Sequence, residues 1–141
     1  VCMFVSLTLT NTNKEMAVIG AVAGIMTAMT TGFPAGQIPN LVDKALTTVF
    51  FGILLRTMQR KGEVKLYQYG ILFFIATMFS GSIFLTVCII MGKLLGLQEV
   101  IQIFQGGLIP MLIAVVFPTA CASAVFGTLM IKLINILKKT R

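Results

Sequence analysis

The stretch TTGFPAGQIPNLVDK, residues 30–44, lies between two strongly apolar runs and concentrates polar, helix-breaking residues at one place in the chain. It contains two prolines, two glycines and an adjacent acid and base. Pro34 and Pro39 lack the backbone N–H that a helix interior requires, and glycine permits unusual backbone dihedrals. We therefore expect one helix to end near Thr31 and another to begin after the second proline.

The composition around this stretch indicates a chain that is surrounded by lipid. Of the 141 residues, 57% are hydrophobic and 11% are charged, against about 25% charged residues in an average soluble domain. The mean hydropathy is +1.00. A soluble domain of this size could not bury so much apolar surface, and no strand-like alternation persists along the chain. The sequence predicts an all-α integral membrane protein, folded as a helical bundle.

We expect one membrane-embedded helical domain over residues 1–141, with five transmembrane segments at about 1–10, 16–31, 41–55, 66–91 and 107–131. Val1 already lies in an apolar run, so we expect an N-terminal truncation and six helices in the intact protein. Sixteen residues in a helix extend roughly 24 Å, less than the roughly 30 Å of a bilayer core. Residues 16–55 therefore form either two crossings, which we favour, or a re-entrant hairpin.

The basic residues predict the orientation of these segments. If each segment crosses once, Lys44 and Lys93 lie on one side, and nine basic residues share the other: Lys14, Arg56, Arg60, Lys61, Lys65, Lys132, Lys138, Lys139 and Arg141. Cytoplasmic loops carry the excess of Lys and Arg, which predicts a multi-pass protein of the bacterial cell membrane with a cytoplasmic C-terminus. Because the charges form short clusters beside apolar segments, no nucleic-acid partner is expected.

The polar residues of the opening stretch have a structural and a functional interpretation. Asn40 is expected to cap the helix that begins at Leu41, with Asp43 in its first turn and Lys44 reaching the outer surface. Alternatively, one outward cavity is faced by the helix N-terminus and by four side chains, those of Gln37, Asn40, Asp43 and Lys44. Short apolar segments interrupted by Gly and Pro indicate such a site in transporters. Lys44 would bind a carboxylate and Asp43 an ammonium group. On this interpretation, neutralising either charge weakens binding with little loss of folded protein.

Later segments supply candidate walls for such a cavity. Ser80 and Thr119 fall near the middle of their segments, although such hydroxyls also bond between helices or to their own backbone. Phe33, Phe50 and Phe51 are candidate aromatic walls, with packing or lipid contact as the alternative. Pro118 should kink the last segment.

Other chemistry is not expected. The chain has no His, no carboxylate pair in a span, and three Cys without metal-ligand spacing, so neither an enzyme nor a metal or cofactor site is predicted.

The motif GFPAGQIPN, followed by Asp43 and Lys44, resembles the bacterial tryptophan-transporter family, which is similar to the substrate-binding S components of energy-coupling-factor importers. The resemblance runs through most of the chain and is specific over residues 27–44. One difference is Ala35, where relatives tend to have Gly.

This resemblance implies tryptophan as the ligand, a site open to the outside, and partners comprising a transmembrane coupling subunit and ATPase subunits. The indole N–H would need an acceptor, for which Gln37, Asn40, Ser80 and Thr119 are the candidates. A non-transporting membrane scaffold and a self-sufficient permease remain the alternatives.

Overall fold

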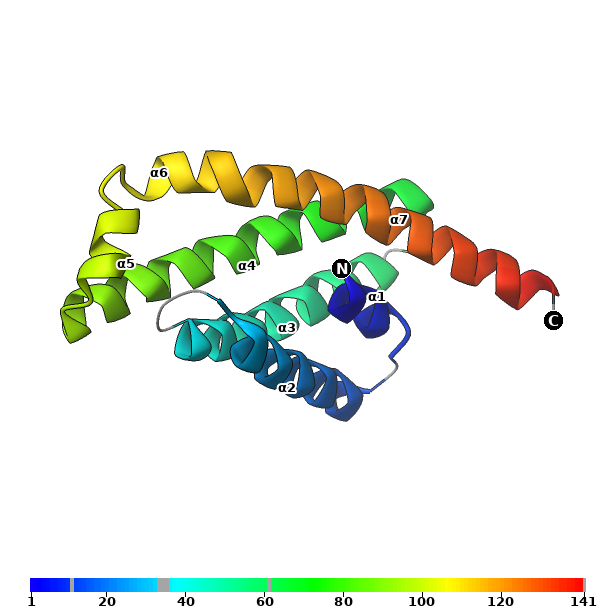
Figure 1. Ribbon diagram of the computed structural model, residues 1–141. Helices are drawn as coiled ribbons and strands as arrows, with labels where there is room; N and C mark the ends of the chain where they lie inside the picture. Colours follow the sequence, from blue (N-terminus) through cyan, green and yellow to red (C-terminus); the bar gives the residue numbers. More distant parts are fainter. Residues whose placement is uncertain (11, 33–35, 61, 141) are drawn as a thin grey trace.

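Helices account for all the secondary-structure elements in the part of the chain that the structure, a computed structural model, describes: residues 1–10, 12–32, 36–60 and 62–140 (Figure 1). In order they are α1 (Cys2–Thr8), α2 (Asn13–Thr30), α3 (Gln37–Arg60), α4 (Leu66–Leu95), α5 (Gln98–Ile103), α6 (Leu108–Met111), the π-helical η1 (Leu112–Val116) and α7 (Phe117–Thr140). The predicted all-α class is confirmed.

Local capping interactions explain where α2 begins and where α4 ends. Thr12 precedes α2, and its hydroxyl accepts from the backbone N–H of Glu15 at 3.2 Å. The Glu15 carboxylate accepts in return from the backbone N–H of Thr12 at 3.3 Å, which completes a capping box. The long helix α4 ends at Gly96, whose φ of +64° is a left-handed conformation that glycine adopts without steric cost.

The start of α3 differs from the prediction. The helix begins at Gln37 and not at Leu41, and Pro39 lies in its first turn. A proline is tolerated there because the first N–H groups of a helix have no intrahelical partner. Asn40 is therefore not the N-cap: its backbone N–H already bonds to the carbonyl of Gly36 at 3.0 Å. The expected position of Asp43 in the first turn is also wrong, since it falls in the second.

Within the described part of the chain, three helices are long and apolar enough to cross a membrane: Gln37–Arg60, Leu66–Leu95 and Leu108–Lys139. The helix α3 is longer than the predicted segment 41–55, and its 24 residues extend about 36 Å. The expected segments 1–10 and 16–31 correspond to α1, with 7 residues, and α2, with 18, and neither is among these three. The prediction of five visible crossings is therefore not confirmed.

The helices pack in a chain of neighbours. α2 lies against α3, α3 against α4, and α4 against α7, while α1 contacts α2, α3 and α7 (Figure 1). Small residues permit close approaches between helices. Between α2 and α3, a Cβ at Gly20 would lie 2.4 Å from the Thr48 hydroxyl oxygen. Between α4 and α7, a Cβ at Gly127 would lie 2.3 Å from Cδ2 of Phe73.

An aromatic cluster forms the core where α1, α3 and α4 meet. The ring of Phe51 stacks on those of Phe4 and Phe73, with centroids 5.0 and 6.0 Å apart. Phe51 is fully buried in this cluster, which agrees with the packing alternative for this residue. Phe50 stacks on Phe79 with centroids 3.9 Å apart.

We expect Gly127→Ala to lower the free energy of unfolding by about 1–3 kcal/mol, because the new methyl group would overlap the buried ring of Phe73. Thermal unfolding in detergent, followed by circular dichroism, measures the effect. Gly106→Ala is the matched control, since a Cβ there has no described atom within 4 Å. Equal melting of the two variants would show that the α4–α7 contact yields easily.

Candidate functional site

A cavity of about 670 Å³ lies between α3, α4 and the continuous run from α6 to α7, with α1 at one end. Its volume falls within the range of about 300–1,000 Å³ that is usual for small-molecule sites. Its apolar lining includes the aromatic rings of Phe4, Phe84 and Phe126. Its polar lining consists of Thr31, Asn40, Asp43, Lys44, Thr77, Ser80, Thr119 and Ser123.

The cavity brings together most of the side chains that the sequence singled out. Among its described lining are Asn40, Asp43, Lys44, Ser80 and Thr119, which come from three helices. Gln37 is exposed at the start of α3 and is not part of this lining. Phe33 lies outside the described residues.

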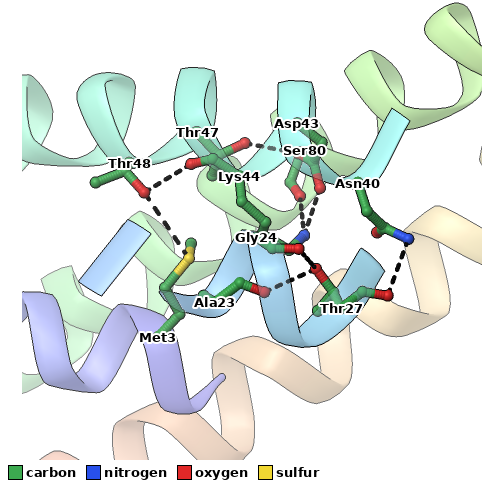
Figure 2. Close-up of polar contacts among 10 residues, drawn as sticks. All are labelled: Met3, Ala23, Gly24, Thr27, Asn40, Asp43, Lys44, Thr47, Thr48 and Ser80. Carbon is green, nitrogen blue, oxygen red and sulfur yellow. Dashed lines mark hydrogen bonds and ion pairs between the residues drawn. The ribbon is translucent and has the colours of Figure 1, made fainter. Parts of the chain in front are cut away.

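An ion pair between Asp43 and Lys44 is the main electrostatic feature of the site (Figure 2). The Lys44 ammonium bonds to Asp43 Oδ2 and also lies 3.3 Å from Ser80 Oγ on α4. The other carboxylate oxygen of Asp43 accepts from the Thr47 hydroxyl at 2.8 Å. Asp43 is 1% exposed, whereas the Lys44 side chain is 19% exposed. The acid is therefore covered and satisfied, and the base reaches the cavity.

Lys44 keeps capacity for a ligand. An ammonium group has three N–H donors, and the contacts with Asp43 and Ser80 account for two of them. A carboxylate in the cavity could accept from the third donor, and it could also accept from the Ser80 hydroxyl. The arrangement suits a small anion attached to an apolar body.

Asn40 and Thr119 each donate a side-chain hydrogen bond to a backbone carbonyl. The Asn40 side-chain nitrogen donates to the carbonyl of Thr27 at 3.4 Å, which ties α3 to the last turns of α2 (Figure 2). The side-chain oxygen of Asn40 is then the acceptor that it offers to the lining. The Thr119 hydroxyl donates to the carbonyl of Val115 at 2.6 Å, which is the back-bonding alternative that the sequence left open.

Two hydroxyls of the lining were missed by the sequence analysis. Thr77 Oγ1 on α4 donates to Ser123 Oγ on α7 at 2.8 Å, and Ser123 is 3% exposed. Helical spacing could have revealed them. Thr77, Ser80 and Phe84 are three and four residues apart, and so lie on one face of α4. On α7, Thr119 and Ser123 are likewise four residues apart and lie on one face.

The expected irregularity at Pro118 takes the form of a π-helical turn over Leu112–Val116. Proline has no N–H to continue the regular pattern of bonds, and single π-turns are frequent at functional sites. The turn packs tightly against α4: a Cβ at Gly81 would lie 2.4 Å from Cγ1 of Val116. This contact places Met111 and Val115 on the cavity wall.

A metal site requires several ligating side chains close together. Among the side chains that the structure describes, which leave out that of Glu99, no group of three or more His, Cys, Asp or Glu is arranged to hold a metal ion. The polar chemistry of the cavity is that of a single ion pair, hydroxyls and one amide.

Comparison with known proteins gives a consistent family. The model of the family described as "Tryptophan transporter TrpP" matches residues 1–140. A "Probable tryptophan transport protein" of Bacillus subtilis is 35% identical over 126 residues, which cover 89% of this chain and 66% of the relative. Relatives with the same name from Clostridium acetobutylicum and Clostridium perfringens are 32% and 29% identical, covering 90% and 94% of this chain.

The chain spans 66%, 68% and 72% of the lengths of these three curated relatives, or about two thirds. No match to the chain was found among solved structures.

Proposed function

Because the chain belongs to the tryptophan transporter TrpP family, we propose that it forms the membrane-embedded substrate-binding part of an amino-acid uptake protein, with tryptophan as the substrate. The observation that carries this proposal is the Lys44 ammonium, held by Asp43 and Ser80 on the wall of an otherwise largely apolar cavity of about 670 Å³. Residues 1–141 act in it as one membrane-embedded domain.

In the proposed complex, the amino acid binds by its carboxylate to Lys44 and Ser80. A charge-assisted hydrogen bond of this kind contributes about 1.5–3 kcal/mol. The aromatic side chain fills the apolar part of the cavity, which Phe4, Phe84 and Phe126 line. Apolar contact area supplies most of the remaining affinity.

Asp43 contributes mainly by holding Lys44 in place. Both of its carboxylate oxygens already accept hydrogen bonds from side chains of α3, and it is 1% exposed. It is therefore poorly placed to bind the ammonium group of the ligand, which was the role that the sequence suggested. The side-chain oxygen of Asn40 is a better acceptor for that group, because Asn40 is only partly buried on the same lining.

The proposed direction of transport is inward across the bacterial cell membrane, with the C-terminus in the cytoplasm. The clustering of basic residues supports this orientation. Arg56 and Arg60 lie near the end of α3, and Lys138 and Lys139 lie in the last turn of α7. Basic residues gather on the cytoplasmic side of membrane proteins. The site, near the opposite end of α3, then faces outward. We further propose six crossings in the intact protein, and energy supplied by a coupling subunit with ATPase subunits.

The binding experiment uses the full-length protein purified in detergent. Equilibrium dialysis with radiolabelled tryptophan measures the binding. We expect saturable binding that excess unlabelled tryptophan displaces. Absence of binding would favour a membrane scaffold, and uptake by liposomes that contain the purified protein alone would favour a self-sufficient permease over a partner-driven one.

The orientation makes a separate prediction. In a full-length variant whose native cysteines are replaced, we expect Gln37→Cys to react with an impermeant thiol reagent added outside cells, and Glu63→Cys to be protected. Both positions are exposed in the structure, so access from each side of the membrane decides the result. Labelling of Glu63→Cys in intact cells together with protection of Gln37→Cys would reverse the orientation and the direction of uptake.

A further inference from the structure

The hydroxyl pair Thr77–Ser123 has no role in the proposed function so far, although it lines the same cavity. An aromatic amino acid with an indole ring brings a polar N–H into that cavity. Burying this donor without an acceptor would cost binding energy, so a specific site needs a carbonyl or hydroxyl oxygen for it. The question is which lining oxygen is placed to accept.

The polar side chains near the ion pair are less suitable. The Ser80 hydroxyl contacts the Lys44 ammonium and belongs to the end of the cavity that attracts a carboxylate. Thr119 is exposed, and its hydroxyl already bonds to the carbonyl of Val115 on its own helix. Gln37, a candidate on sequence grounds, is not part of the described lining.

The pair consists of a buried Ser123 and a partly buried Thr77, and it has free acceptor capacity. Ser123 is 3% exposed, and Thr77 donates to it at 2.8 Å across the α4–α7 contact. A hydroxyl that donates its proton keeps both lone pairs on its oxygen for accepting. The Thr77 oxygen can therefore accept a further hydrogen bond, and it lies on the wall of a largely apolar cavity.

The position of the pair along α4 also fits. Thr77 precedes Ser80 by three residues on the same face, a separation of about 4.5 Å along the helix axis. A ligand held at Lys44 and Ser80 can thus direct its ring toward Thr77 and Ser123, with Phe126 beyond them on α7.

Resting on the proposed function, we infer that the Thr77–Ser123 hydroxyl pair accepts the indole N–H and determines the preference for tryptophan over aromatic amino acids that lack this donor. Thr77 oxygen is the accepting atom, and Ser123 holds the Thr77 hydroxyl so that its lone pairs face the cavity. Such a pair also joins two helices, so the test needs a readout that helix packing alone does not change.

That readout is the ratio of two affinities, for tryptophan and for its benzothiophene analogue, in which sulfur replaces the ring N–H. Binding of each is measured in detergent with the full-length protein. We expect wild type to prefer tryptophan by about tenfold, and Thr77→Val and Ser123→Ala to reduce this preference to about twofold or less. Thr128→Val, which removes a hydroxyl on α7 that bonds to Ala124 and does not line the cavity, should keep it.

The outcomes separate the inference from the proposed function. If wild type binds tryptophan and its analogue equally, or if both variants keep the wild-type preference, the hydroxyl pair does not accept the indole N–H, although tryptophan binding stands. If wild type binds neither compound, the proposed function fails and the inference with it. If Thr77→Val does not fold, Ser123→Ala and the wild-type ratio still decide the matter.

Discussion

Replacing Lys44 by Met is expected to lower the free energy of unfolding by about 3–5 kcal/mol and to remove detectable tryptophan binding. The substitution leaves the carboxylate of Asp43, which is 1% exposed, without its cation in a region of low dielectric constant. From the sequence alone, either neutral variant was expected to fold nearly normally. The burial of Asp43 changes that expectation.

The double variant Asp43→Asn with Lys44→Met separates the two effects. It removes both charges, so we expect it to regain most of the lost stability, while binding stays absent because no cation remains for the ligand carboxylate. Unfolding in mixed micelles with increasing SDS measures stability, and equilibrium dialysis with radiolabelled tryptophan measures binding. If Lys44→Met unfolds like wild type, Asp43 is either protonated or hydrated in the membrane, and the pair is not a structural element.

Removing the carboxylate from the ligand is the second change with a large expected effect. We expect tryptamine to bind the full-length protein about 10- to 100-fold more weakly than tryptophan, because it loses the charge-assisted bonds to Lys44 and Ser80. Indole-3-propionate keeps the carboxylate and lacks the ammonium group, so its loss should be smaller. Competition against radiolabelled tryptophan measures all three affinities.

The result for tryptamine distinguishes the roles of the two charged residues. Tight binding of tryptamine with weak binding of indole-3-propionate would mean that Asp43 binds the ligand ammonium after all, and that the ion pair opens when substrate enters. The preference for a carboxylate should persist in Thr128→Val, whose changed side chain does not line the cavity.

Much of the fold follows from local properties that can be read along the chain. Composition alone indicated helices in lipid, and the motif of residues 27–44 indicated the family that the match over residues 1–140 confirms. The end of α2 was predicted closely, because it depends on nearby breakers. The start of α3 was predicted four residues too late, because the prediction placed Pro39 before the helix and it in fact lies in the first turn. A proline is compatible with either position, and the sequence does not distinguish them.

The site was predicted in its types of residue and less well in its geometry. Asn40, Asp43 and Lys44 were identified because charged and amide side chains are costly in an apolar chain and so need a reason to be there. Phe51 could not be distinguished from a wall residue, since a phenylalanine has the same sequence signal in a core as in a cavity.

By itself the sequence determined that this chain is an all-helical membrane protein of the tryptophan transporter family with an acid–base pair near the start of α3, because hydrophobicity, breakers and charge act locally. Only the tertiary structure decided which residue of that pair, the acid or the base, is available to a ligand in the cavity. It brings Lys44 to Ser80, 36 residues away, and Thr77 to Ser123, 46 residues away. Such contacts depend on the rotation of each helix about its axis, which is set by close packing at positions such as Gly81 and Gly127. No local pattern in the sequence encodes that rotation.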